Sequence, residues 1–132
     1  MPQYFTHEQA NAALALIRPL MARLMRIRDE ILGSQPEVWP VIQKGAGNGG
    51  SKLAGEMAFR FKEVDDLVRR IQAMGVVIKD LNTGLVDFPA WREGREVYLC
   101  WRLDEPVVSH WHELDSGFAG RKKLSQIGRA HV

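Results

Sequence analysis

The sequence predicts an α+β fold in which a long antiparallel helical hairpin packs with a small antiparallel β-meander of three to four strands. Two stretches within residues 6–75 carry apolar residues at helical spacing, and from Gly75 onward apolar residues recur at every second position. This change of period separates the helical hairpin, 6–75, from the β-meander and closing segment, 76–124. At 132 residues the chain is expected to form a single domain over 1–126. The alternative is a mostly helical protein with a short β-hairpin.

The first helix is predicted over residues 7–32. Thr6, followed three positions later by Gln9, has the pattern of a capping box at its start, and Gly33 is a stop signal. Pro19 lies inside the helix, lacks an N–H donor, and is expected to kink or divide it. Spacings of three and four residues give this helix a heptad seam. The seam consists of Ala10, Ala13, Ile17, Leu20, Leu24, Ile27 and Ile31.

A second helix is predicted from a cap at Ser51 to its end at Gly75. Before it, residues 33–50 break the helical pattern with prolines and with the glycine-rich run 45–50. The apolar stripe of the second helix consists of Leu53, Met57, Phe61, Val64, Val68 and Ile71. Two long amphipathic helices whose seams face one partner predict an antiparallel hairpin. The seam surface that the hairpin leaves open has to meet the rest of the chain or a second subunit.

The meander is predicted to contain strands at 76–81, 85–88 and 96–103, with a further extended segment at 107–113. Pro89 ends the second strand or places it at an edge of the sheet, because proline donates no ladder hydrogen bond.

Composition excludes several classes of protein. With 45% hydrophobic and 26% charged residues, the chain is neither disordered nor collagen-like. No apolar run approaches the roughly 18 residues of a membrane helix, and the start shows no secretory signal. One cysteine, Cys100, excludes an internal disulfide and fits a reducing cytoplasm. A net charge of +2 gives no basis for predicting nucleic-acid binding.

The last six residues, 127–132, resemble the translated read-through of a sequencing-library adapter. We expect this tail not to be native and leave it out of every functional argument.

The register of the last two predicted strands decides which side chains share a face. A three-residue turn at 104–106 places Cys100 opposite His110 and Tyr98 opposite His112, and it gathers the apolar residues on the other face. A two-residue turn separates Cys100 from both histidines. The apolar alternation favours the first register.

Cys100, His110 and His112 then form a candidate metal site. Thiolate and imidazole ligands suit zinc and leave one position open, for which Asp87 or Asp115 is a candidate fourth ligand. The alternative is a small buried thiol beside polar cross-strand neighbours.

Charged residues of the meander form a second constellation. One interpretation is an ionic network in which pairs of acidic and basic residues hold the loops in place. The other is a pocket for a small anion, which Arg102 and Arg121 would bind from two sides. The set consists of Asp80, Asp87, Arg95, Arg102, Asp115 and Arg121. The glycine-rich run 45–50 matches a phosphate-binding pattern, but no βαβ unit surrounds it, and a flexible connector is the better interpretation.

Several segments of the meander resemble a bacterial family known as domain of unknown function 2203. They are 79–81, 84–90, 94–103, 111–115 and 117–121. The resemblance runs from Tyr4 to about Arg121 and implies a small cytoplasmic bacterial protein with no assigned activity. It also implies an aromatic residue at the position of His110, which favours His112 as the functional histidine.

The leading functional hypothesis is a non-enzymatic binding or assembly module that forms a homodimer through its helices. The heptad seams, the surplus of apolar helix surface and the tryptophans motivate it. The alternative is a small metal- or anion-dependent enzyme that uses a Cys/His/Asp cluster on the meander. Nucleic-acid binding ranks third, and no membrane partner is expected.

Overall fold

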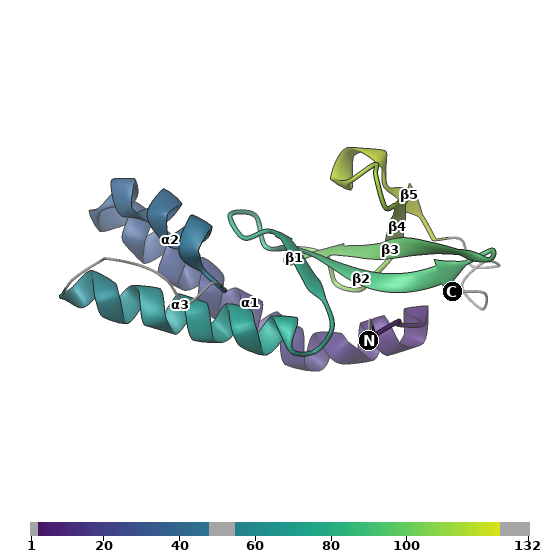
Figure 1. Cartoon of the computed structure of the whole chain (residues 1–132), viewed down its shortest axis with the longest axis horizontal. Helices are drawn as coiled ribbons and strands as arrows, with labels where there is room; N and C mark the ends of the chain where they lie inside the picture. Colours follow the sequence, from purple (N-terminus) through teal and green to yellow (C-terminus); the bar gives the residue numbers. More distant parts are fainter. Residues whose placement is uncertain (1–2, 48–54, 125–132) are drawn as a thin grey trace.

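The computed structural model describes residues 3–47 and 55–124. It has the α+β fold that the sequence predicts: helices and sheet lie side by side, and the first helix extends beneath both (Figure 1). The elements follow in the order α1 (His7–Ser34), the 3-10 turn η1 (Pro36–Val38), α2 (Trp39–Gly45), α3 (Glu56–Gln72), β1 (Val77–Asp80), β2 (Leu85–Arg92), β3 (Arg95–Arg102), β4 (His110–Glu113), η2 (Phe118–Gly120) and β5 (Lys122–Lys123).

Helix α1 begins where the capping box predicts. The Gln9 N–H donates to Thr6 Oγ1 at 3.0 Å, and the Thr6 N–H donates to Gln9 Oε1 at 2.9 Å. Pro19 does not divide the helix. Both Pro19 and Ala15, whose carbonyl loses its donor, are exposed, so water can replace the missing hydrogen bond. Gly33 does not stop the helix either, and α1 continues to Ser34.

The helical part contains three α-helices among the described residues, where the sequence predicted a hairpin of two. The additional helix is α2, which forms in the region predicted as a break. Pro36 and Pro40 stand in the first turns of η1 and α2, where a proline loses no helical hydrogen bond. Trp39 and Ile42 of α2 are buried, at 3% and 0% exposed, so this short helix adds to the core.

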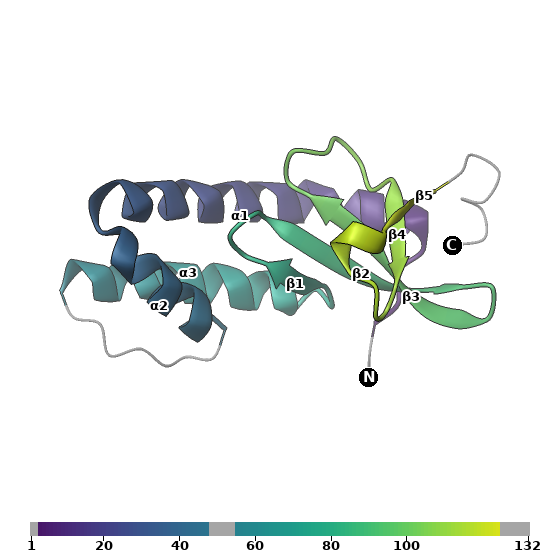
Figure 2. The ribbon, with the colours of Figure 1, turned by 90° about the horizontal axis from the view of Figure 1, so that it is seen from above.

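Helix α3 runs back beside α1 in the opposite direction (Figure 2). Four residues of its predicted stripe, Phe61, Val64, Val68 and Ile71, are buried. The predicted cap Ser51, the stripe residue Leu53 and most of the run 45–50 lie outside the described residues, and so does the tail 127–132. No helix in the described part of the chain is both long enough and apolar enough to cross a membrane.

Within the described part of the chain the sheet contains five strands, where the sequence predicted three to four. They pair antiparallel in chain order, β1-β2-β3-β4-β5. The prediction missed β5, in which Lys122 and Lys123 pair with Trp111 and His110 of β4. Two exposed lysines carry no apolar alternation, so no strand signal marks them.

Strand β2 extends to Arg92 and passes through Pro89, so the predicted end at residue 88 is wrong. The alternative prediction, that Pro89 places this strand at an edge of the sheet, is also wrong, because β2 lies between β1 and β3. Pro89 lies beyond the part of β2 that pairs with β1, and its carbonyl accepts the Phe5 N–H at 2.8 Å. A two-residue turn of Glu93 and Gly94, with φ values of 53° and 78°, joins β2 to β3.

The predicted register between β3 and β4 is confirmed: Cys100 pairs with His110, and Tyr98 pairs with His112. The connecting loop is wider than the predicted three-residue turn, because pairing stops at Cys100 and β4 begins only at His110. Glu105, which lies in this loop, bonds back to the end of β3. Its carboxylate accepts a backbone N–H of β3 at 2.8 Å.

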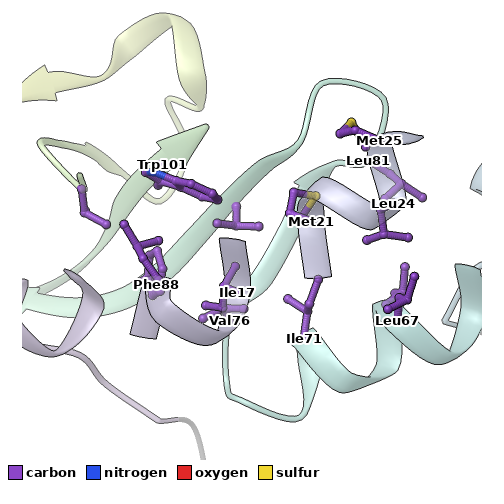
Figure 3. Packing of buried hydrophobic residues seen from close by; sticks show 14 of the residues in the cluster. Ile17, Met21, Leu24, Met25, Leu67, Ile71, Val76, Leu81, Phe88 and Trp101 are labelled. Carbon is purple, nitrogen blue, oxygen red and sulfur yellow. The ribbon is translucent and has the colours of Figure 1, made fainter. Parts of the chain in front are cut away.

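The core lies between one face of the sheet and the helices. Phe88 of β2 and Trp101 of β3, both fully buried, lie beside Ile17 of α1 (Figure 3). In the α1 seam, Ala13 and Leu20 are partly buried and the remaining members are fully buried. The seam of α1 therefore closes on the rest of its own chain.

The opposite face of the sheet is covered by the chain that follows β4, including η2 (Figure 1). Arg121, which follows η2, reaches the Sγ atom of Cys100, with its Nη1 at 3.8 Å. This outer face carries the candidate site.

Candidate metal centre

Three neighbouring strands bring Asp87, Cys100 and His112 together. Asp87 of β2 pairs directly with Cys100 of β3, so their side chains share a face of the sheet. His112 of β4 pairs with Tyr98, two residues before Cys100, and therefore stands diagonally opposite Cys100 on the same face. Two hairpin registers thus bring together residues that lie up to 25 positions apart.

The three side chains are buried and converge. Asp87 and Cys100 are 0% exposed and His112 is 1% exposed, and one ligand atom from each lies within 4.8 Å of the other two. His112 Nε2 is 3.0 Å from both carboxylate oxygens of Asp87. The other ring nitrogen, Nδ1, lies 2.7 Å from the carbonyl oxygen of Glu113 and donates to it, which fixes the orientation of the ring.

Burial dominates the electrostatics of the cluster. It raises the pKa of Asp87, although the neighbouring His112 opposes the shift. Burial, followed by the Asp87 charge, raises the pKa of Cys100 to about 12. The Cys100 thiol therefore keeps its proton at neutral pH and is not an activated nucleophile. A metal ion bound here would take the place of that proton.

The donor set suits a borderline metal ion. Zinc combines cysteine sulfur, histidine nitrogen and carboxylate oxygen at about 2.0 to 2.3 Å, which sets tetrahedral ligand atoms about 3.3 to 3.5 Å apart. The 3.0 Å separations between Nε2 and the Asp87 oxygens come within a few tenths of an ångström of that spacing. The Nδ1–H bond of His112 to a carbonyl is the support that metal-bound histidines have, and it leaves Nε2 for the ion.

His110 lies outside this cluster, although it pairs with Cys100. Its Nδ1 is 3.1 Å from Ser109 Oγ and 3.6 Å from a carboxylate oxygen of Glu105. Glu105 in turn holds Arg121 by two hydrogen bonds of 3.0 and 2.6 Å. A Glu105–Arg121 pair therefore borders the cluster, next to the Cys100 sulfur.

The residues of the predicted anion pocket do not gather in one place. Asp80 and Arg102 line a pocket of about 200 Å³. Arg95 is bound to Glu113 by two hydrogen bonds of 2.9 and 2.6 Å, and Asp115 is exposed on the closing segment. The remaining two, Asp87 and Arg121, belong to the buried cluster and its border.

Sequence reasoning assigned Glu105 to a turn and missed its contact with Arg121, because that contact joins two loops and follows no periodicity. It also left Asp87 and Asp115 as equal candidates for a further ligand. The signal that favours Asp87 was present in Glu93-Gly94, since a two-residue turn fixes the register that sets Asp87 opposite Cys100.

Fold and site together define a small α+β protein with a buried Asp/Cys/His cluster on the outer face of its sheet. The model of the family described as Uncharacterized conserved protein (DUF2203) matches residues 3–124, and the chain belongs to this family. The resemblance carried by the strand motifs is thereby confirmed. No curated protein and no solved structure matches the chain.

Proposed function

We propose that this chain is a small metal-binding protein whose centre consists of Asp87, Cys100 and His112, with zinc as the expected ion. The observation that carries the proposal is the convergence of three different metal-donor side chains, all buried, from three strands. Cys100, as the sole cysteine of the chain, is available as a ligand only in the reduced state. A cytoplasmic location, which we infer from that cysteine usage, meets this need.

The competing interpretation is a buried ion pair between Asp87 and His112 that serves stability alone. Such a pair needs no third donor, yet the Cys100 sulfur belongs to the same group of ligand atoms. Buried ion pairs are also poor stabilisers, because desolvation offsets most of their attraction. Both points favour a bound ion over a purely structural pair.

Metal analysis of the untagged protein, purified without chelator, tests the proposal. Mass spectrometry of the elements is expected to find close to one zinc ion per chain. Cys100→Ser, which removes one donor with little change of volume, is expected to lose most of it. His110→Ala is the matched control, since this histidine neighbours the cluster without belonging to it. A native protein that holds no metal and takes up neither added zinc nor cobalt contradicts the proposal.

Self-association through the helices stays a second proposal. Burial of the α1 seam within the chain removes the surplus apolar surface that motivated it, but α1, α2 and α3 still carry large exposed apolar side chains. They are Leu16, Leu32, Val41 and Phe59. Light scattering over a range of concentrations tests it: a homodimer is expected to dissociate in Leu16→Glu or Phe59→Glu, and a monomer at every concentration contradicts it.

A further inference from the structure

The proposed centre leaves one coordination position to a molecule from outside the cluster. Within residues 3–47 and 55–124, the group of donor atoms has three members, and neither His110 nor Asp115 belongs to it. Zinc sites with three protein ligands and one exchangeable ligand are the kind that binds substrates, whereas structural zinc sites use four protein ligands. The nature of the fourth ligand is therefore set by the groups that surround the cluster.

Those groups favour an anion. A divalent ion bound to one thiolate and one carboxylate has no net charge, so it does not repel an incoming anion. Arg121 Nη1 lies 3.8 Å from the Cys100 sulfur, and the Arg121 side chain is 13% exposed, so its charge acts through a poorly screened environment. Lys79, whose charge acts on Asp87, lies 4.8 Å from the Tyr98 ring and forms no ion pair among the described residues.

A pocket lies on the same face of the sheet as the cluster. Leu85 and Arg102 line it and pair across β2 and β3. They stand two residues from Asp87 and Cys100 respectively, a step of about 7 Å along a strand. The pocket of about 200 Å³ is large enough for a small molecule.

Phe118 of η2 lines this pocket and also contacts Arg121. Its ring contacts two guanidinium groups: the Cζ atom of Arg121 is 4.2 Å from the ring centre, and that of Arg102 is 5.1 Å away. Phe118 is 37% exposed and belongs to the segment that covers the outer face of the sheet (Figure 1). Phe118 is therefore in contact with both the pocket and the arginine that lies beside the Cys100 sulfur.

We infer that the fourth position of the metal centre binds a small oxyanion, a carboxylate or phosphate group, which enters beside Phe118 and lies between the ion and Arg121. This inference rests on the metal centre proposed above. Arg121 is suited to the role because guanidinium groups bind carboxylates and phosphates through paired hydrogen bonds. In the structure this guanidinium group donates two hydrogen bonds to the Glu105 carboxylate, which an incoming oxyanion would have to replace.

The test uses the whole chain, as its sequence is given, loaded with cobalt, a coloured substitute for zinc. Its near-ultraviolet thiolate band reports ligation by Cys100, and its visible bands report the remaining coordination. Sodium acetate is titrated in one arm and inorganic phosphate in the other, which distinguishes the two sources of oxyanion. We expect a saturable change of the visible bands with at least one of them, while the thiolate band persists.

Two variants with opposite expected effects on anion affinity distinguish a specific role of Arg121 from a general loss of structure. Arg121→Met is expected to weaken anion binding about tenfold or more, the value of a charge-assisted hydrogen bond. Glu105→Gln, which frees Arg121 from its carboxylate partner, is expected to tighten anion binding. Arg95→Met is the matched control, since Arg95 is also held by a glutamate, Glu113, through two hydrogen bonds.

Visible bands that respond to neither anion, in a protein with an intact thiolate band, overturn the oxyanion site and leave the metal centre standing. Equal anion affinity in the wild type and in Arg121→Met overturns the role of Arg121. A missing thiolate band overturns the metal centre and the oxyanion site together.

Discussion

Breaking the buried pair of Asp87 and His112 is expected to lower the free energy of unfolding of the metal-free protein by a measurable amount. Asp87→Ala leaves the His112 ring without the carboxylate that lies 3.0 Å from its Nε2, at a position where 1% of the residue is exposed. Breaking a buried pair by removing one partner costs about 3 to 5 kcal/mol. For a domain of this size that corresponds to a fall in Tm of about 10 to 20 °C.

A double-mutant cycle in the presence of a chelator isolates the interaction. Urea unfolding, followed by tryptophan fluorescence, is measured for the wild type, Asp87→Ala, His112→Ala and the double variant. Because the second substitution removes the group that the first leaves unpaired, the double variant is expected to lose about 1 to 3 kcal/mol less than the sum of the singles. Additive losses, or a cost of Asp87→Ala below about 1 kcal/mol, refute the reasoning.

The exposed pair of Arg95 and Glu113 is the control for this cycle. Its geometry is as good as that of the buried pair, with hydrogen bonds of 2.9 and 2.6 Å, but its side chains are 47% and 33% exposed. Solvent screening reduces the coupling of such pairs to about 1 kcal/mol or less. The difference in coupling free energy between the two cycles therefore reports the effect of burial and not that of hydrogen-bond geometry.

Three further tests concern packing, backbone conformation and charge. Ile17→Ala empties a fully buried site between α1 and the sheet and is expected to cost about 2 to 5 kcal/mol in urea unfolding. Gly84→Ala is expected to destabilise the protein more than Gly94→Ala: both positions have positive φ, 71° and 78°, but a Cβ at Gly84 meets another Cβ atom at 3.2 Å, whereas that at Gly94 meets open space. Burial raises the pKa of Glu105, but its hydrogen bonds with arginines outweigh this and hold the pKa below the ordinary 4.5. A lowered carboxyl pKa stabilises the fold above pH 4.5 and loses that contribution as the pH falls, so Glu105→Gln is expected to flatten the acid side of the stability profile, and an unchanged slope contradicts this.

Local rules account for the parts of the fold that the sequence predicted. The capping box at Thr6 and Gln9 depends on residues three apart, and both of its hydrogen bonds form. The register that pairs Cys100 with His110 follows from the alternation of Val97, Leu99 and Trp101 with polar residues, because a shift by one residue would turn this apolar set to the wrong face.

The parts that were missed depend on contacts between distant segments. Along β2 the residues from Leu85 to Ala90 are all buried, so no alternation reveals its true length or its faces. β5 exists only because Lys122 and Lys123 meet β4. Likewise, α2 depends on burial of Trp39, whose neighbours lie elsewhere in the chain. Tertiary context decides all three.

Asp87 is the residue whose chemistry fits its position in the fold least well. It is the one ionisable side chain in six consecutive buried positions of β2, where an apolar β-branched residue would satisfy both the strand and the core. Burial of an unpaired carboxylate is strongly unfavourable, and the partners of Asp87, which are His112 and the Cys100 thiol, offset only part of that cost. Chains depart from local consistency chiefly at functional sites. Cys100 and His112 add two more ionisable groups to the same buried point, and the divalent cation that we propose here would supply the positive charge that makes the burial of all three favourable.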